Sequence, residues 1–361
     1  MTSEAFESRG LPGDTSFDTC LEVQIGVDFV VGSRLQIGGS RPHRGLNMRN
    51  TVKGTETIKP ISILKPRRLA GGDRVGVISP AGPTNRSDLE PGLRLLSSSG
   101  FEVFLAPHVY DRKDYLAGDD EARLEDLHTM FRDPGVKAIF CARGGYGTLR
   151  LLNRIRYDWI RENPKIIAGY SDVTALLLAI YRMTGLITFH GTVVRELSQH
   201  NHRNWESLLR LLSMNKPLSI HLTEKTALLP GRAEGPLIGG NLSLICHLLG
   251  TRFLPSLEGC ILFIEEKGEP LYRLDRMLTH LALAGQLNKL SGLIAGHFEG
   301  CGDIPGIHRL LMDMLSDLCI PMATGLPVGH GSKNLALPLG TMAVLDTDLM
   351  TLSITEPCIQ G

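Results

Sequence analysis

Long apolar runs and an excess of one charge are both absent from this sequence. Its 361 residues include 38 Lys and Arg against 38 Asp and Glu, so the formal net charge at pH 7 is zero. A balanced charge produces no global field that would attract nucleic acid or an anionic membrane surface. No stretch approaches the run of about 18 apolar residues that a transmembrane helix needs, and the first residues lack the basic and apolar regions of a secretory signal. We therefore expect a cytoplasmic protein whose partners include neither nucleic acid nor membrane.

Cysteine is sparse and has no ordered spacing. The chain holds 7 cysteines, an odd number, and none of them belongs to a C-x-x-C pair. This usage is typical of free thiols in a reducing compartment, and it argues against a disulfide framework or a zinc site. No two histidines combine metal-ligand spacing with a supporting carboxylate. We expect neither a metal nor another cofactor.

The length and the pattern of the chain predict two domains after an N-terminal extension. Residues 1–65 are rich in Gly, Ser, Arg and Thr, and we expect them to be poorly ordered. From 66 to 214, short apolar strands alternate with amphipathic helices, which predicts an α/β domain with a mostly parallel sheet covered by helices. Pro and Gly interrupt the pattern at 215–232, where we expect a linker. A smaller mixed α/β domain is expected at 233–361.

One stretch, 165–175, reads as strand, tight turn and helix, with Ser171 in the turn. A serine there stands at the carboxyl end of a strand and at a helix N-terminus, where backbone N–H groups favour a developing negative charge. This is the geometry of a nucleophile elbow, although Val173 replaces the last glycine of the usual Gly-x-Ser-x-Gly. The simpler interpretation is that Ser171 or Asp172 caps the helix. The stretch alone leaves both interpretations open.

A glycine-rich turn, Arg143-Gly144-Gly145-Tyr146-Gly147, follows another predicted strand. Its backbone could hold a phosphate, but Arg150 stands where a dinucleotide fingerprint has its third glycine. Its N–H groups could instead form an oxyanion hole beside Ser171. A plain tight turn is the third possibility.

Three further side chains are candidates for acid–base chemistry. Glu265 ends a predicted strand, where it could orient a histidine or be an ordinary loop carboxylate. His330 lies in the constrained loop Pro-Val-Gly-His-Gly, where it could be a general base or a turn residue. His190 also follows a strand and is the competing base if the site belongs to the first domain alone.

Eight short motifs, in order and with preserved spacing from about residue 70 to 345, resemble those of the LD-carboxypeptidase family of serine peptidases. This family contains murein tetrapeptide carboxypeptidases and microcin-immunity peptidases. The motifs are Val75-x-x-Ile78-Ser79-Pro80-Ala81, Tyr115-Leu116-Ala117-Gly118, Arg143-Gly144-Gly145-Tyr146-Gly147, Gly169-Tyr170-Ser171-Asp172-x-Thr174-Ala175, His190-Gly191, Gly239-Gly240-Asn241-Leu242, Leu262-Phe263-Ile264-Glu265-Glu266, and Gly329-His330 with Asn334 and Leu337-Pro338-Leu339-Gly340.

The resemblance implies a Ser-Glu-His triad at the interface of the two domains. Ser171 would be the nucleophile, His330 the general base and then acid, and Glu265 the carboxylate that orients the histidine. The backbone N–H groups implied for the oxyanion hole are those of Asp172 and of Gly144 or Gly145. Two positions depart from the family pattern: Thr192 stands where proline is common, and Glu266 where aspartate is common. Two adjacent glutamates leave the choice between Glu265 and Glu266 open.

The same resemblance implies removal of the terminal D-alanine from a murein tetrapeptide, in cytoplasmic cell-wall recycling. The alternative within the family is a microcin-immunity peptidase that cleaves peptidyl- or aminoacyl-nucleotides. Such enzymes carry extra aromatic residues in the loop that joins the domains, whereas residues 195–232 contain only Trp205. An alternative of another class is a non-catalytic nucleotide- or sugar-binding module. Family members are often dimers, so a homodimer is a further expectation.

Overall fold

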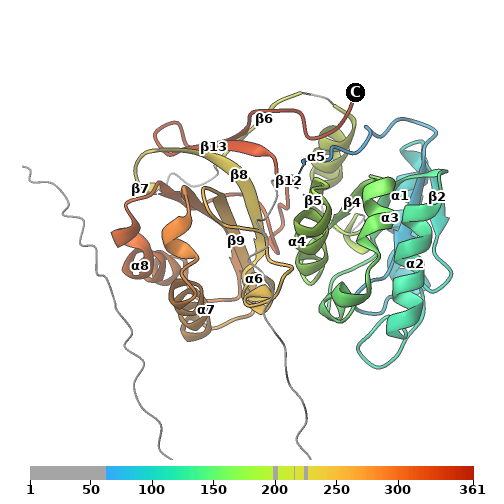
Figure 1. Cartoon of the computed structure of the whole chain (residues 1–361), viewed down its shortest axis with the longest axis horizontal. Coiled ribbons are helices and arrows are strands. Elements are labelled where there is room, and N and C mark those ends of the chain that lie inside the picture. The colour runs from blue at the N-terminus through green and yellow to red at the C-terminus, as the bar shows by residue number, and fades with distance from the viewer. Residues whose placement is uncertain (1–61, 198–201, 215, 223–226) are drawn as a thin grey trace, which may run out of the picture. The chain divides into compact units, whose positions relative to one another are not determined.

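The computed structural model describes residues 62–197, 202–214, 216–222 and 227–361. These residues belong to one unit of the fold and contain two β-sheets, each with its own helices (Figure 1). All but the last four residues of the extension expected at 1–65 lie outside the described part. Those last residues pair with the body, because Leu64 bridges Leu186 and Lys65 Nζ lies 2.9 Å from a carboxylate oxygen of Glu356.

The first sheet has six strands in the order β12-β5-β4-β3-β1-β2. Strands β1 to β5 are parallel, while β12 joins the edge antiparallel to β5. Helices cover the sheet, and their apolar faces fill its core. The strands are β1 (Arg74–Ile78), β2 (Glu102–Leu105), β3 (Val136–Cys141), β4 (Ile166–Gly169), β5 (Thr188–His190) and β12 (Leu337–Leu339). The helices are α1 (Arg86–Ser98), α2 (Asp120–Arg132), α3 (Tyr157–Glu162), α4 (Val173–Thr184) and α5 (His202–Ser213).

A buried lysine connects two elements of this domain. Lys165 immediately precedes β4, and its amine donates to the carbonyl oxygens of Met130, at 2.8 Å, and of Asp133. Both carbonyls belong to the C-terminal end of α2, where helix carbonyls have no intrahelical donor. A positive charge there is favoured by the helix dipole. Burial lowers the pKa of Lys165 to about 8.

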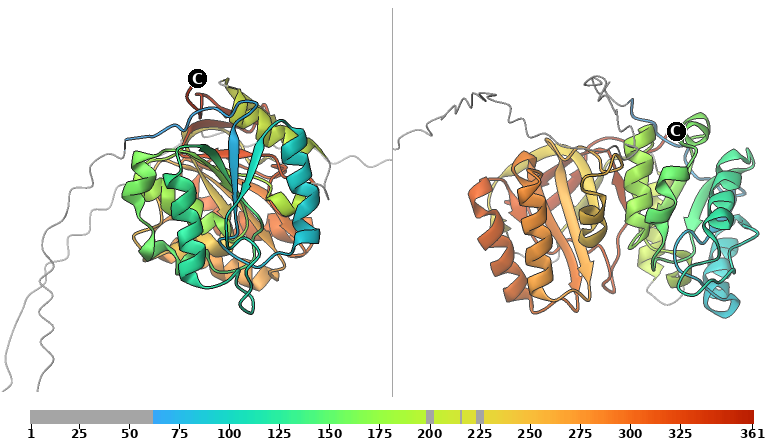
Figure 2. Two further views of the ribbon diagram at one scale, coloured as in Figure 1. Left: turned by 90° about the vertical axis from the view of Figure 1, so that its right-hand side faces the viewer. Right: turned by 60° about the horizontal axis from the view of Figure 1, so that its bottom comes forward.

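The second sheet has eight strands in the order β6-β14-β13-β8-β9-β10-β11-β7. Its centre, from β8 to β11, is parallel, and the outer strands are antiparallel. The predicted fold class is thus confirmed: a helix-covered, mostly parallel sheet followed by a mixed α/β domain. Helices α7 and α8 lie side by side and appear in orange in Figure 2. The strands are β6 (Leu218–His221), β7 (Ala227–Leu229), β8 (Arg232–Asn241), β9 (Ile261–Lys267), β10 (Gly292–Glu299), β11 (Met322–Ala323), β13 (Met342–Asp346) and β14 (Thr351–Ile354). The helices are α6 (Leu242–Leu248), α7 (Leu271–Leu283) and α8 (Ile304–Leu315).

The range 215–232, expected to be a linker, contributes strands β6 and β7 to the two edges of the second sheet. These strands are short, which suits edge positions and explains why the sequence pattern did not reveal them. A second departure from a simple two-domain division is β12, which returns from the last third of the chain to the first sheet. Pro338 lies within it, as is usual for an edge strand. The domain boundaries themselves stay a prediction.

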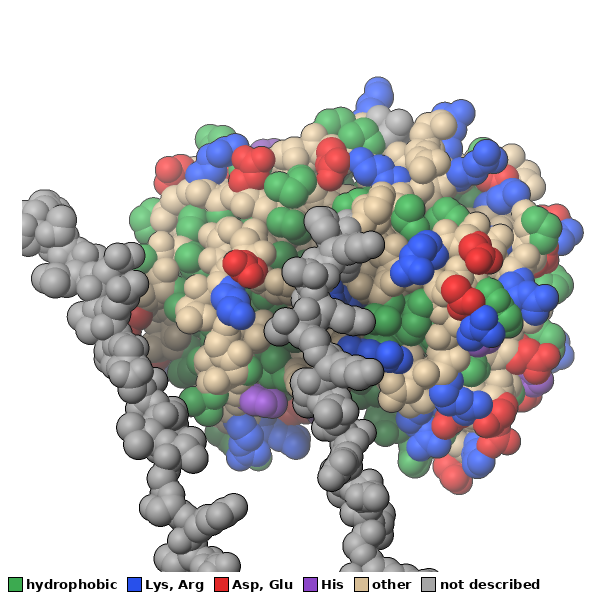
Figure 3. All heavy atoms as spheres, in the orientation of Figure 1, with side chains coloured by type: hydrophobic (Ala, Val, Ile, Leu, Met, Phe, Trp, Pro, Cys, Tyr) green, Lys and Arg blue, Asp and Glu red, His purple; other side chains and the backbone are tan. Residues whose placement is uncertain are grey.

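Charged side chains of both signs are interspersed over the right-hand part of the face drawn in Figure 3.

Within the described ranges, no helix has the combination of length and apolar character that crossing a bilayer requires.

The two sheets meet where α4 packs against β8 and α6. The contact is close because Gly240 has no side chain, and a Cβ built there would lie 2.6 Å from Thr174 Cγ2. Its φ of 138° is also one that L-residues rarely adopt. The next residue, Asn241, donates its backbone N–H to Thr174 Oγ1 at 3.2 Å. Gly240 therefore sets how near the second sheet approaches the helix that follows Ser171.

We expect Gly240→Ala to lower the free energy of unfolding by about 1–3 kcal/mol, because the new methyl group combines backbone strain with overpacking. Urea denaturation of the two proteins measures the change. Gly71→Ala is the matched control, since nothing lies within 4 Å of a Cβ at Gly71. Equal midpoints and slopes for Gly240→Ala and wild type would contradict the close contact.

Candidate active site

Ser171 lies in a sharp turn between β4 and α4, and its backbone is left-handed with φ of 65°. The left-handed conformation costs an L-residue about 1–2 kcal/mol, and strain of this kind is concentrated at functional sites. Glycines make the turn possible: a Cβ at Gly144 would lie 2.9 Å from Ser171 Oγ, and a Cβ at Gly169 would lie 2.9 Å from Val173 Cγ1. The turn has the strand–turn–helix form that the sequence predicts.

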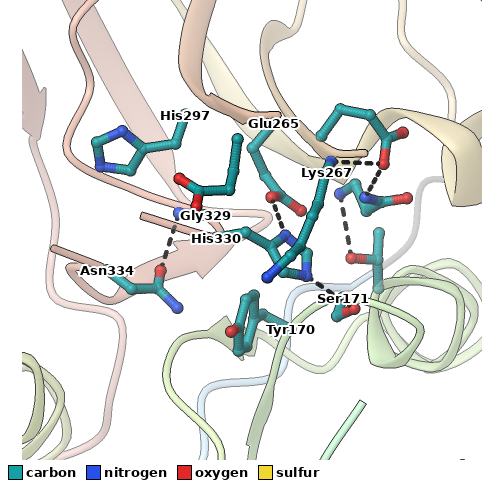
Figure 4. A network of polar contacts seen from close by, with 12 residues as sticks. Tyr170, Ser171, Glu265, Lys267, His297, Gly329, His330 and Asn334 are labelled. Atoms are coloured by element: carbon teal, nitrogen blue, oxygen red, sulfur yellow. Dashed lines mark hydrogen bonds and ion pairs between the residues drawn. The ribbon is translucent and has the colours of Figure 1, made fainter. Parts of the chain in front are cut away.

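The structure brings Ser171, His330 and Glu265 into one hydrogen-bonded chain (Figure 4). The carboxylate can only accept, so His330 Nδ1 donates to Glu265 Oε2 at 2.7 Å. His330 Nε2 then accepts from Ser171 Oγ at 3.0 Å. Ser171 follows β4 of the first sheet, Glu265 is in β9 of the second, and His330 is in the loop before β12. The arrangement therefore depends on both sheets.

The loop that carries His330 is fixed by hydrogen bonds from backbone N–H groups to asparagine side chains. Gly329 donates its N–H to Asn334 Oδ1 at 3.0 Å, and Asn334 donates its own N–H to Asn204 Oδ1 at 3.0 Å. Gly329 has φ of 107°, and a Cβ there would lie 2.7 Å from Glu265 Oε2. Only glycine therefore lets the loop pass so close to the carboxylate. The sequence pointed to Asn334 through its motif but contained no signal for Asn204.

Glu265 is the glutamate that faces His330, and Glu266 faces the other side of β9. Glu265 is 0% exposed, and within the described part of the chain its Oε1 has no hydrogen-bond partner. Glu266 accepts from Asn241 Nδ2 at 2.7 Å and from the N–H and Oγ of Ser243 at 2.8 and 2.7 Å. Successive residues of a strand point to opposite faces, which explains the different partners. Glu266 thus fixes the start of α6.

The pKa of His330 is raised above its ordinary value of 6.5. Burial lowers this pKa, but the hydrogen bond to Glu265 and the negative charge of Glu265 together outweigh burial. Lys267 opposes them with a smaller effect, and Figure 4 shows its side chain running alongside the His330 ring. Because strand residues two apart share a face, the position of Lys267 could have been inferred once Glu265 was chosen.

His190, the competing base, is not hydrogen-bonded to Ser171. Its side chain is fully buried between the rings of Tyr170 and Phe263. The centroid of its ring lies 5.8 Å from that of Tyr170 and 5.1 Å from that of Phe263. Burial lowers the pKa of His190 to about 3, and the charge of His330 contributes a smaller part of this decrease. It is therefore a neutral residue of the protein interior.

Asp172 is not a side-chain cap of α4. Its Oδ2 accepts instead from the N–H of Thr148 at 2.9 Å, and Thr148 Oγ1 donates to its carbonyl oxygen at 2.6 Å. These two bonds tie the end of the glycine-rich turn to the residue after Ser171. Within the described ranges, the N–H groups of Gly144, Gly145 and Asp172 donate no hydrogen bond. The Ser171 hydroxyl is likewise used for His330 and not for a helix cap.

A pocket of about 250 Å³ opens in front of Ser171 and His330. Most of its side chains are polar or charged, and Tyr170 donates its hydroxyl to both carboxylate oxygens of Glu196, at 2.7 and 2.8 Å. No group of three His, Cys, Asp or Glu residues in the described part of the chain is arranged to hold a metal ion. A larger pocket of about 520 Å³, between α5 and β6, shares no lining residue with this one. The pocket at Ser171 is lined by Arg143, Gly144, Gly145, Tyr170, Ser171, Arg195, Glu196, Lys267 and His330.

Two family descriptions match consecutive parts of the chain. Residues 75–191 match the LD-carboxypeptidase N-terminal domain, and residues 234–345 match the LD-carboxypeptidase C-terminal domain. The first match includes Ser171 and the glycine-rich turn, and the second includes Glu265 and His330.

Several known proteins are similar over nearly their whole length. A probable murein peptide carboxypeptidase of Bacillus subtilis is 37% identical over 82% of this chain and 96% of its own. The microcin C7 self-immunity protein MccF of Escherichia coli is 30% identical over 80% of this chain and 94% of its own. A structure of MccF in complex with glutamyl sulfamoyl guanosine is 28% identical and covers 82% of this chain and 100% of that one, with a TM-score of 0.77. The crystal structure of muramoyltetrapeptide carboxypeptidase from Oxalobacter formigenes is 30% identical and covers 78% and 99%, with a TM-score of 0.72.

The left-handed turn leads to a prediction about stability. Ser171→Gly and Ser171→Ala both remove the hydroxyl, but only glycine relieves the strain at φ of 65°. We expect Ser171→Gly to be more stable than Ser171→Ala by about 1 kcal/mol, because relief of strain exceeds the entropy that glycine loses on folding. Chemical denaturation measures the difference. Ala175→Gly inside α4 is the control and should instead destabilise by about 1 kcal/mol; a Ser171→Gly protein no more stable than Ser171→Ala would argue against a strained turn.

Proposed function

Because the chain belongs to the LD-carboxypeptidase family, we propose that it is a serine carboxypeptidase acting on murein tetrapeptide. It hydrolyses the L,D peptide bond before the terminal D-alanine and serves cell-wall recycling in the cytoplasm. The observation that carries the proposal is the hydrogen-bonded chain from Ser171 through His330 to Glu265. The murein peptide relative and the muramoyltetrapeptide carboxypeptidase structure support the substrate class.

In the proposed mechanism, His330 Nε2 accepts the proton of Ser171 as Oγ attacks the scissile carbonyl carbon. Glu265 holds the imidazole in the tautomer with hydrogen on Nδ1 and stabilises the imidazolium that forms. His330 then donates the proton to the leaving amine of D-alanine. A water molecule, deprotonated by the same nitrogen, hydrolyses the acyl-enzyme ester and regenerates Ser171.

The negative charge that develops on the carbonyl oxygen is stabilised by backbone N–H groups. The candidates are those of Gly144, Gly145 and Asp172, and their lack of partners within the described residues supports this role. The start of α4 adds the positive end of a helix dipole next to Ser171.

The second candidate function is cleavage of a peptidyl- or aminoacyl-nucleotide, as the similarity to MccF suggests. Such a substrate favours an exposed aromatic ring near the site on which the base can stack. Trp205 is the only aromatic residue in 195–232, and it is 4% exposed. Its ring packs against Phe101 and Phe140, and its Nε1 donates to Ser99 Oγ at 3.0 Å. Trp205 is therefore a core residue of the first domain and offers no ring for stacking. The exposed Tyr146 of the glycine-rich turn is the ring that this alternative would use.

The proposal is tested by D-alanine release from purified murein tetrapeptide. We expect release by the wild type and loss of at least about 10³-fold in kcat for Ser171→Ala, because the nucleophile is absent. Circular dichroism of the variant checks its folding, and an aminoacyl sulfamoyl nucleoside is assayed in parallel. A chelator should leave the rate unchanged. Cleavage of the aminoacyl sulfamoyl nucleoside without cleavage of the tetrapeptide would favour the MccF-like function. A Ser171→Ala protein as active as wild type would refute the triad.

Activity should also depend on the protonation of His330. Only the neutral imidazole can accept a proton, so activity is present above the pKa of His330 and lost as the pH falls through it. Since Glu265 raises this pKa above 6.5, the acid limb of kcat/KM should lie above pH 6.5. Glu265→Gln should move the limb to lower pH and reduce kcat/KM on the order of 10³–10⁴-fold.

The pH–rate profiles of wild type, Glu265→Gln and Glu266→Gln make this test specific. Glu266 does not contact His330, so its variant should keep the acid limb of the wild type. A limb that stays in place in Glu265→Gln, or a rate independent of pH between about 5 and 8, would count against a histidine base oriented by Glu265.

A further inference from the structure

A carboxypeptidase must recognise the end of its substrate, and this requirement restricts where a cation can be. In the leaving D-alanine, only the amide nitrogen and Cα separate the free carboxylate from the scissile carbonyl. The carboxylate is therefore about one residue length, roughly 3.8 Å, beyond the bond that Ser171 attacks. A cation with this role rests on the proposed carboxypeptidase function.

The pocket at Ser171 contains more positive than negative side chains. Arg143 and Arg195 enter it from the first domain and Lys267 from the second, while Glu196 is the one carboxylate among its lining residues. Glu196 accepts the hydroxyl hydrogen of Tyr170, so part of its acceptor capacity is used within the protein. A pocket with this balance of charge suits an anionic ligand.

The three cations differ in their surroundings. Arg195 is paired with Asp88, with a distance of 3.1 Å between Nη2 and Oδ2. Lys267 has an exposed side chain that runs alongside His330 (Figure 4), where it acts as a point charge on the imidazole. Arg143 is half-buried, and no carboxylate of the described residues forms an ion pair with it. Its side chain donates one hydrogen bond, from Nη1 to the carbonyl oxygen of Pro83 at 2.8 Å.

Arg143 is also next in the chain to a residue that lies against Ser171. It directly precedes Gly144, whose backbone is so near Ser171 that a Cβ there would lie 2.9 Å from Oγ. Burial and the neighbouring charge of Arg195 lower the pKa of Arg143, and the carboxylates of Asp88 and Glu196 offset this only in part. The guanidinium stays protonated at neutral pH all the same. An anion held there would supply the missing compensation.

We propose that Arg143 binds the free carboxylate of the terminal residue of the substrate and so makes the enzyme specific for chain ends. The planar guanidinium can hold a carboxylate through two parallel N–H···O bonds, with its Nη1 bond to Pro83 fixing the orientation of the fork. Arg195, already paired with Asp88, adds positive potential but is not the anchor. The bound carboxylate places the scissile carbonyl against Ser171 Oγ and the free N–H groups of the glycine-rich turn.

The test compares two substrates, murein tetrapeptide and the same peptide with its terminal carboxylate converted to an amide. For the wild type we expect kcat/KM to be about 10²-fold higher for the acid, the effect of losing charge-assisted hydrogen bonds. Arg143→Gln should lower kcat/KM for the acid by a similar factor and leave the amide nearly unchanged, so that the preference falls towards 1. Arg143→Lys keeps the charge without the fork and should retain part of the preference.

Lys267→Gln is the matched control, because it removes another cation from the same pocket. It should keep the preference for the acid while moving the acid limb of the pH profile upward, since a positive charge near His330 is lost. Collapse of the preference in Lys267→Gln and its survival in Arg143→Gln would overturn the assignment.

The remaining outcomes separate the carboxylate anchor from the proposed function. A wild type that hydrolyses neither peptide refutes the carboxypeptidase function, and the anchor falls with it. Hydrolysis of acid and amide at equal rates, releasing D-alanine and D-alaninamide respectively, leaves the carboxypeptidase in place, and so does an Arg143→Gln protein that loses both activities equally. Either of these two results shows that Arg143 only supports the turn and refutes the carboxylate anchor.

Discussion

The hydrogen bond from Ser171 Oγ to His330 Nε2 joins a turn of the first sheet to the loop that runs from the second sheet to the first, and the geometry of the site depends on it. A hydrogen bond of 3.0 Å forms only when the turn and the loop keep their relative positions. The contact between Gly240 and Thr174 fixes the approach of β8 to α4, one turn after Ser171. On the other side, Glu265 fixes the imidazole from a strand that pairs directly with β8. The packing between the sheets and the orientation of the histidine are thus one constraint.

Glycine has a structural role at each close approach around the site. Gly144 lets the turn lie against Ser171, and Gly329 lets the histidine loop pass the Glu265 carboxylate. A side chain at either position would meet the very atoms that form the hydrogen-bonded chain. The surrounding network, from Asn204 to Asn334 to Gly329, then holds the loop without any metal or disulfide in the described part of the chain. Close backbone packing and these hydrogen bonds together position the polar groups.

Much of this arrangement was predictable from sequence, because strands, turns and motifs are local features. The strand–turn–helix at Ser171, the strand ending near Glu265 and the constrained loop at His330 all follow from short patterns. The choice of Glu265 over Glu266 could not be predicted from sequence, because it depends on which face of β9 is turned towards the first sheet. The role of Asn204 could not be predicted either, because its hydrogen bond to Asn334 joins residues 130 positions apart. The edge strands at 218–221 and 227–229 were missed since short, half-exposed strands carry a weak pattern.

Because of strand β12, the first sheet cannot be completed by the first half of the chain alone. It follows His330 by only a few residues, and it supplies the edge strand that pairs with β5 of the first sheet. A fragment that ended at the predicted linker would expose that edge of β5, with unpaired N–H and C=O groups open to association with other chains. The histidine loop is meanwhile anchored in both sheets, by β11 before it and β12 after it. Recombination between homologues at the predicted linker would therefore pair β5 of one parent with β12 of the other.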